Sequence, residues 1–478
     1  MYKIKLYQYL IPLGICLAVV SCAPANAPLA ENKTVPESFD KSMGTDTTNT
    51  STTPWRTYFK DSNLVNLIDT ALKNNQELLI TLQEIEIAKN DIRVKKGLLL
   101  PTVGIGAGAG IEKVGRYTSQ GAGDASTEIK PGKEMPDPLS DFKLAAYAHW
   151  EVDIWKKLRN SKKAAVSRYL STVEGKNFVI TNLISEVADS YYELLALDSQ
   201  LEIVRKNIEL QTNALEVVKI QKEAARTTEL AVQKFQAEVL ASKSMEFDIL
   251  QNIKETENKI NFLLGQYPQE IRRDKTNFMG LMPSVINSGI PSQLLANRPD
   301  IKQAELELEA AKLDVKVARA EFYPSLDITA AIGINAFKPS YLFTLPESLL
   351  YSLAGDLAAP LINRNAIKAE YSTANARQLQ ALYNYERTIL NAYLEVSTQL
   401  SKINNLEKSY DLKSQEVVAM NRSIDVAGDL FKSAKADYFE VLMTQRDALE
   451  SKLELIDTKK EQLNASVLVY RDLGGGWK

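Results

Sequence analysis

The sequence predicts a mainly α-helical fold with a membrane-spanning β part, built from two structural repeats that each hold a helix, a pair of strands and a long helical hairpin. Three observations lead to this prediction. One segment is written twice, four stretches alternate apolar with polar residues, and two long stretches contain almost no proline or glycine. Repetition marks a duplicated unit, a period of two marks strands, and long uninterrupted stretches mark helices.

The duplication covers residues 87–111, which align without a gap on residues 310–334. The residues of the first copy that recur in the second include Ala88, Lys89, Asp91, Val94, Pro101, Ile105, Gly110 and Ile111. Because proline ends a helix, each copy indicates a helix that stops at Pro101 or Pro324 and continues as a strand with one apolar face.

Residues 1–21 have the pattern of a lipoprotein signal peptide, with basic residues before an apolar stretch that is too short for a spanning helix. The segment ends at Ser21-Cys22, which resembles the lipobox of bacterial lipoproteins. We therefore expect Cys22 to carry acyl chains as a stable membrane anchor. Ala23 follows in place of an aspartate, and by the same resemblance this directs the anchor to the outer membrane. An ordinary signal peptide with an incidental cysteine is the alternative.

Residues 22–54 are rich in small and polar residues and lack apolar periodicity, which predicts a flexible tether between the lipid and the fold. Apolar residues at helical spacing follow Trp55, and Asn74-Asn75 is the expected break between the first two helices. The expected organisation is a first structural repeat at 55–267, an inter-repeat linker at 268–297 and a second repeat at 298–478.

Four strands are expected, at about residues 101–113, 143–155, 325–337 and 349–361. Each has one apolar face and about the length that a tilted strand needs to cross a bilayer, with tryptophan or tyrosine near several ends. Four strands are too few to close a barrel, and an open edge in lipid would leave backbone groups unsatisfied. The strands must therefore be pooled between subunits. A soluble two-sheet domain with one buried face would show the same period and is the alternative.

Residues 157–264 and 362–473 each predict an antiparallel hairpin of long helices. The turns are expected at 224–228 and 428–435, where apolar periodicity is lost. Apolar residues on one side of these helices predict that the helices pack side by side with another face in solvent. A simple coiled coil would show the same pattern, but it would not need the strand pair attached to each hairpin.

Composition argues against several classes of function. The net charge is -3, and acids and bases are mixed along the chain, so no basic face is available for nucleic acid. One histidine and two cysteines predict no metal site, no cofactor and no disulfide framework. Glu151 and Asp153 fall on one strand face and could form the carboxylate pair of a hydrolase, but nothing else marks them as catalytic. We expect a conduit and not an enzyme.

Several motifs carry a family resemblance. The most specific is the run from Leu294 to Ile301, with Asn297-Arg298-Pro299-Asp300 at its centre, followed by Phe322-Tyr323-Pro324. Supporting matches are Leu263-Leu264-Gly265, the strand end from Trp150 to Ile154, and the closing run from Tyr470 to Trp477. Through these residues nearly the whole mature chain resembles the TolC-type outer-membrane efflux proteins, most closely their lipoprotein branch. Pro299 and Asp300 suit the first turn of a helix, so the motif looks architectural.

The resemblance implies a homotrimer in which each subunit gives four strands to a twelve-stranded outer-membrane β-barrel and its helices to a tapering periplasmic α-barrel. It implies a passive exit duct of a tripartite drug-efflux system, with no catalysis of its own. Small molecules would arrive from an inner-membrane resistance-nodulation-division pump through a periplasmic adaptor. The channel of a type I protein secretion system is the alternative within the family. A coiled-coil adaptor lipoprotein is the alternative outside it.

The resemblance also places a periplasmic aperture near the second hairpin turn, where Arg422, Asp425 and Asp429 are the candidate residues. The position expected for a lining aspartate is Gly428. A ring of carboxylates at a threefold axis would favour cations. Solvated charges at a hairpin tip are the alternative. Two departures concern the junctions: Ala225 and Ala434 replace turn glycines, and the second strand-end motif is Leu353-Ala354-Gly355-Asp356.

Overall fold

The computed structural model describes residues 34–39, 48–275, 278–283, 287–362, 364–433 and 435–478. The expected signal peptide, the candidate lipid site Cys22 and the turn residue Ala434 lie outside the described residues. Two compact units are present, and each draws on both sequence repeats. The sheet unit holds Ile87–Tyr169 and Leu306–Leu382, and the helical unit holds Glu31–Glu86, Leu170–Glu305 and Tyr383–Lys478.

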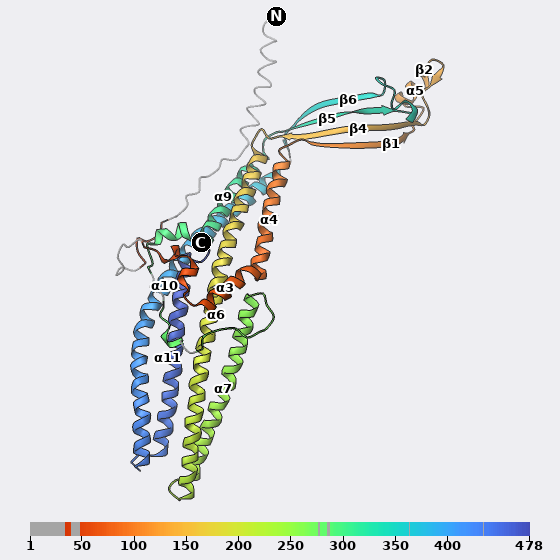
Figure 1. The fold of residues 1–478 in the computed structure, drawn as a ribbon. Helices are drawn as coiled ribbons and strands as arrows, with labels where there is room; N and C mark the ends of the chain where they lie inside the picture. The colour runs from red at the N-terminus through yellow and green to blue at the C-terminus, as the bar shows by residue number, and fades with distance from the viewer. Residues whose placement is uncertain (1–33, 40–47, 276–277, 284–286, 363, 434) are drawn as a thin grey trace. The chain divides into compact units, whose positions relative to one another are not determined.

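The sheet unit contains one four-stranded antiparallel sheet with the order β1-β4-β5-β6 (Figure 1). The strands are β1 (Thr102–Glu112), β4 (Leu139–Val152), β5 (Ser325–Ala336) and β6 (Leu349–Ala358). All four predicted strands are therefore confirmed, although β4 begins earlier than expected and β6 ends earlier. Strands β1 and β6 form the two edges, and among the described residues no strand pairs with their outer sides.

The segment between β1 and β4 contains structure that the sequence did not predict. It forms α5 (Ser119–Ser126) and a small hairpin of β2 (Glu128–Lys130) and β3 (Lys133–Glu134). The Thr118 hydroxyl caps α5 by accepting a hydrogen bond from the Gly121 amide at 3.1 Å. These elements are short and rich in glycine and serine, so no apolar period marks them.

The predicted helices are present. Helices α4 (Gln76–Gly97) and α9 (Pro299–Ala320) lead into β1 and β5, and the two hairpins are α6 (Lys157–Glu223) with α7 (Glu229–Leu263) and α10 (Asn365–Lys432) with α11 (Tyr438–Asp472). The first turn lies where it was expected. The second turn overlaps the expected range 428–435 but starts later, because α10 continues through Gly428 to Lys432. One glycine costs a helix about 1 kcal/mol relative to alanine, too little to end a helix of 68 residues.

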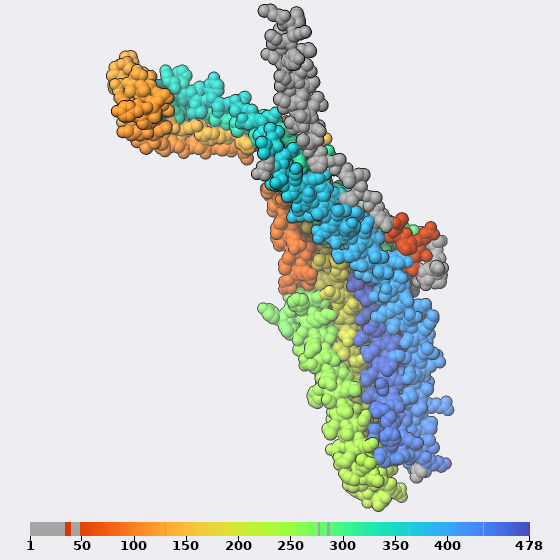
Figure 2. Space-filling view, turned by 180° about the vertical axis from the view of Figure 1, so that it is seen from behind, coloured from red at the N-terminus to blue at the C-terminus, as the bar shows by residue number. Residues whose placement is uncertain are grey.

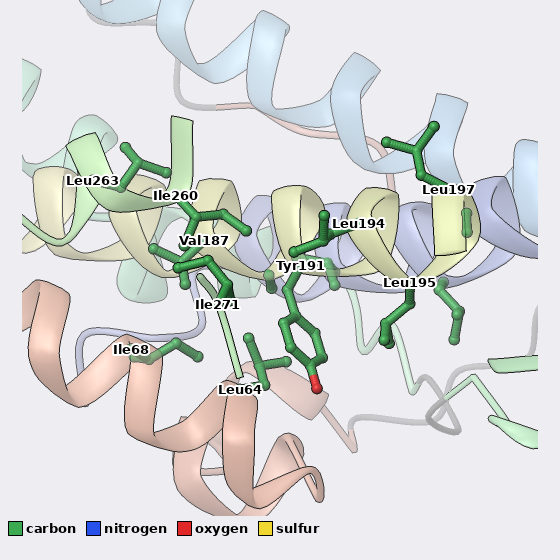
Figure 3. Packing of buried hydrophobic residues seen from close by; sticks show 14 of the residues in the cluster. Leu64, Ile68, Val187, Tyr191, Leu194, Leu195, Leu197, Ile260, Leu263 and Ile271 are labelled. Carbon is green, nitrogen blue, oxygen red and sulfur yellow. The ribbon is translucent and has the colours of Figure 1, made fainter. Parts of the chain in front are cut away.

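In the helical unit, α7, α10 and α11 run alongside one another (Figure 2). The core lies where the hairpins meet α3 (Ser62–Asn74). Leu64 and Ile68 of α3 pack against Val187 and Tyr191 of α6 (Figure 3). The Tyr191 hydroxyl donates to the carboxylate of Asp61 at 2.7 Å, and this carboxylate also caps α3. Packing and capping therefore fix α3 on the first hairpin.

The expectation of a flexible tether up to residue 54 is wrong for its last residues. The backbone of Thr50, in the short 3-10 helix η1 (Thr50–Thr52), donates to the Asn287 carbonyl at 2.9 Å. The Tyr470 hydroxyl donates to the Thr53 carbonyl at 2.6 Å. Phe39 is buried and stacks on Tyr393, with ring centroids 5.6 Å apart. These contacts are tertiary, so local sequence periodicity could not reveal them.

The remaining short elements are α2 (Trp55–Tyr58) before α3, three elements within the inter-repeat linker and one between β5 and β6. The linker elements are η2 (Phe278–Gly280), η3 (Pro291–Gln293) and α8 (Leu294–Asn297), and the loop element is η4 (Pro339–Tyr341).

Candidate functional site

The sheet has one apolar face that runs across all four strands. Directly opposed residues of neighbouring strands share a face, and the register places Ile105 opposite Ala146 and Ala146 opposite Ile332. Other apolar members of this face include Val103, Ala107, Ala109, Ile111, Phe142, Leu144, Ala148, Trp150, Val152, Leu326, Ile328, Ala330, Ile334, Ala336, Leu349, Tyr351, Leu353 and Leu357. The alternation read from the sequence therefore yields a single continuous surface.

This apolar face is exposed. Ile105 retains 82% of its accessible surface, Tyr351 80% and Leu353 79%. A soluble two-sheet domain would cover such residues with a second layer, and among the described residues none packs over this face. An exposed apolar surface of this extent marks contact with lipid or with another protein. The soluble-domain alternative is therefore not supported.

The opposite face is polar and carries charges near the helical end of the sheet. Glu151, Asp327 and Asp356 lie side by side in one row across β4, β5 and β6. The Lys157 ammonium lies 2.5 Å from Glu151, and His149 lies 3.7 Å from Asp327. Glycines occupy most of this face on β1. A side chain at Gly106 would approach the Tyr147 ring to 3.0 Å.

The two carboxylates considered as a hydrolase pair have structural partners. Asp153 lies beyond the end of β4 and accepts hydrogen bonds from the backbone amides of Leu158 and Arg159, both at 3.0 Å. It thereby caps the start of α6, while Glu151 is paired with Lys157. The geometry therefore gives both groups an architectural role and leaves the hydrolase alternative without support.

Aromatic residues at the end of β4 contact the segments that connect the helices to the strands. Trp155 stacks on Tyr323 with centroids 4.8 Å apart, and its indole donates to the Pro324 carbonyl at 2.7 Å. The Trp150 indole donates to the Leu99 carbonyl at 3.2 Å. Asp356 of the second strand-end motif lies within β6, which ends at Ala358.

The aperture candidates Arg422, Asp425 and Asp429 lie on the last turns of α10 and not in a loop. Their spacing of three and four residues places them on one face of the helix. All three are exposed, and Asp429 lies 3.5 Å from Lys432. In the described part of the chain, Arg422 and Asp425 have no ion-pair partner. The structure therefore brings the three candidates together in one charged, solvent-facing stripe.

The family motif at 297–300 forms a buried anchor. Arg298 binds Asp300 at 2.6 Å, Glu395 at 2.8 Å and the Asp472 carbonyl at 3.0 Å. The closing run of the chain adds the Trp477 indole, which donates to the Asn297 carbonyl at 3.3 Å. The motif at 297–300 and the closing run at 470–477 are distant in the sequence but bind each other in the structure. These contacts support an architectural role for both.

A second buried anchor was not found from the sequence. Arg273, in the inter-repeat linker, binds Asp198 of α6 at 2.5 and 3.0 Å and Glu257 of α7 at 2.8 Å. At most 9% of any of these three side chains is exposed. A single arginine in an irregular linker carries no local signal, and only a contact between distant segments could have identified it.

The described residues offer no group of histidine, cysteine, aspartate and glutamate that could hold a metal ion. None of the described helices has the length and apolarity that a membrane crossing requires.

Comparison with known proteins gives a consistent result. A family model described as outer membrane efflux protein matches residues 67–266 and 290–475. The pyoverdine export outer membrane protein OpmQ of Pseudomonas aeruginosa is 28% identical over 467 residues, which cover 98% of this chain and 96% of OpmQ. The probable outer membrane lipoprotein SilC of Salmonella typhimurium is 26% identical over 484 residues, with full coverage of both chains.

Solved structures agree on the fold. The open state of the MtrE outer membrane channel of Neisseria gonorrhoeae superposes with a TM-score of 0.81 at 21% identity, covering 96% of this chain and 99% of MtrE.

Proposed function

The chain belongs to the outer membrane efflux protein family, and from this premise we propose that it is the passive outer-membrane exit duct of a tripartite efflux system. One observation carries the proposal. The sheet exposes a continuous apolar face, and its two edges pair with no other strand among the described residues. Both are costly in an isolated chain, and both are resolved when three copies close a twelve-stranded barrel in a bilayer.

The polar face of the sheet would then line the pore, with the row of Glu151, Asp327 and Asp356 recurring in each subunit. A pore lined in this way conducts polar solutes and favours cations. The duct has no means of supplying energy, so transport is driven by an inner-membrane pump of the resistance-nodulation-division class that connects through a periplasmic adaptor. Relatives named for pyoverdine export and cation efflux support a small-molecule substrate.

We propose that Cys22 anchors the chain to the outer membrane through lipid. The small residue before it supports this role, and so does the relative named as a probable outer membrane lipoprotein. Replacement of Cys22 by serine should abolish incorporation of labelled fatty acid, while the barrel still inserts. Retention of label on the variant would exclude Cys22 as the acylated residue.

The duct itself is tested in planar bilayers with the purified trimer. We expect discrete conductance steps with cation preference. Ile328→Arg, on the apolar face, should lower the number of inserted channels without changing the conductance of each one. In cells that lack their own duct, co-expression with a matching pump and adaptor should restore export. Correctly sized trimers that conduct no ions would contradict the proposal.

A further inference from the structure

The chain contains one complete junction between its two repeats. In the sheet, β4 of the first repeat pairs with β5 of the second, with Leu144 opposite Ile334 and Trp150 opposite Ile328. Beside the sheet, Arg168 of α6 forms an ion pair with Asp314 of α9. A closed ring of identical copies has a second junction of this kind, between the second repeat of one copy and the first repeat of the next.

The duplication specifies which residues correspond. Thr102 pairs with His149 at the start of β1, and Ser325 pairs with Ala358 at the start of β5, so β1 corresponds to β5 and β4 corresponds to β6. The same correspondence relates Asp91 to Asp314 and Arg168 to Arg377. Both members of the ion pair therefore recur in the sequence as the same residue types.

The surfaces that correspond to the internal junction are uncovered in the single chain. On α4, Ile87 is 68% exposed and Val94 is 59% exposed, whereas Ala310, the counterpart of Ile87 on α9, is fully buried. Asp91 and Arg377 are both exposed, and within the described ranges neither has an ion-pair partner. The chain thus carries two halves of a junction that it cannot complete alone.

We propose that β6 of one copy pairs with β1 of the next in the register of the internal junction, and that Arg377 pairs across the same interface with Asp91 of the neighbouring copy. Transfer of the β4–β5 register places Leu353 opposite Ile111 and Leu357 opposite Ala107 of the neighbour. All four residues belong to the apolar face, so this register joins the apolar faces without a step. A slip of one residue would set apolar residues opposite polar ones.

The occupant of this surface is a second copy of the chain, and the inference rests on the proposed trimer. The helix pair supplies a first test. Asp91→Arg and Arg377→Asp should each lower the heat stability of the trimer, because like charges then face each other. The combined exchange should restore it. Failure of the combined exchange to exceed either single variant would overturn the Arg377–Asp91 contact.

The strand register is tested by disulfide cross-linking in membranes. Opposed residues of antiparallel strands alternate between Cα separations of about 5.5 and 4.5 Å, and both fall within the range that a disulfide spans, so two consecutive pairs are tested. We therefore combine Leu353→Cys with Ile111→Cys, and Ala354→Cys with Gly110→Cys. The matched controls keep the β6 cysteines and shift β1 by two residues, to Ala109→Cys and Gly108→Cys. The wild type, with Cys22, controls for unrelated cross-links.

At least one in-register pair should give a covalent trimer on a non-reducing denaturing gel, and the shifted pairs should not. Stronger cross-linking of the shifted pairs would overturn the register. Light scattering of the same variants separates the two proposals. A trimer with shifted cross-links contradicts only the register, whereas a protein that never forms a trimer contradicts the proposed duct as well.

Discussion

Arg273 shows how single residues hold the helical unit together. It lies in the linker after α7, and its side chain reaches buried carboxylates on α6 and α7. Its guanidinium forms two hydrogen bonds to Asp198, the planar paired geometry that arginine favours. This cluster ties the inter-repeat linker to both helices of the first hairpin.

We predict that Arg273→Ala destabilises the protein by about 3 to 5 kcal/mol, because Asp198 and Glu257 would remain buried without a counter-charge. Thermal unfolding of the detergent-solubilised protein measures the effect. A triple variant with Arg273→Met, Asp198→Leu and Glu257→Met should recover most of the loss, since no buried charge remains. A single variant as stable as the wild type would show that the cluster is not a structural anchor.

Asp189 of α6 gives the helical unit a pH-dependent stability. Burial raises its pKa to about 7, the charges of Arg471 and Lys259 oppose the rise, and Glu461 and Glu186 add to it. One of its carboxylate oxygens is buried without a hydrogen-bond partner among the described residues. Because its pKa is higher in the folded than in the unfolded chain, this group reduces stability as pH rises from about 4 to about 7.

Asp189→Asn should therefore raise stability at pH 8 by about 2 to 4 kcal/mol, and the gain should fade towards pH 4. Unfolding midpoints measured across this range test the prediction. Glu209→Gln, an exposed change on the same helix, is the control and should leave the pH profile unaltered. An equal gain at both pH values would assign the effect to packing and not to titration.

At the scale of elements, the strands could be predicted from the sequence. A strand with one apolar face alternates apolar and polar residues, and this pattern is visible without knowledge of the tertiary structure. The long helices could also be predicted, since their sequences contain almost no proline or glycine. Sequence periodicity did not predict α5 or the ordered residues 48–53, whose order depends on tertiary contacts. At the first turn, Ala225 adopts a φ of 55°, so alanine occupies a left-handed position that favours glycine. The sequence showed the substitution but not its conformation.

The two faces of the sheet should respond differently to charge. Ile328→Arg places a cation on the apolar face and should cost about 2 to 4 kcal/mol at mid-bilayer, lowering the yield of inserted trimer. Thr329→Arg, the next residue on β5, faces His149 and Ala354 on the polar side and should be tolerated. Heat-resistant trimer in membrane extracts measures both. Equal losses from both variants would contradict the assignment of the faces.

For the whole molecule, the duplication explains why one chain exposes surfaces that correspond to its own internal junction. The internal junction between the repeats is complete, with β4 on β5 and Arg168 on Asp314. The outer edges, β1 and β6, repeat the same surfaces, and no strand in the described part of the chain pairs with them. The sequence could predict that the strands are pooled because four strands cannot close a barrel. It could not provide the register, which requires the observed pairing of β4 with β5.

The tip of the second hairpin gives the prediction for the assembled duct. In a trimer, Asp425 and Asp429 of α10 would each recur three times about the axis, and their mutual repulsion would be offset by bound cations or by Arg422 and Lys432. Replacement of both aspartates by alanine should then raise single-channel conductance and weaken cation preference, with no loss of trimer. Asp411→Ala, further back on the same helix, serves as the control. Unchanged conductance and selectivity in an assembled double variant would assign the constriction to other residues, and a change of equal size in the control would assign the effect to general surface charge.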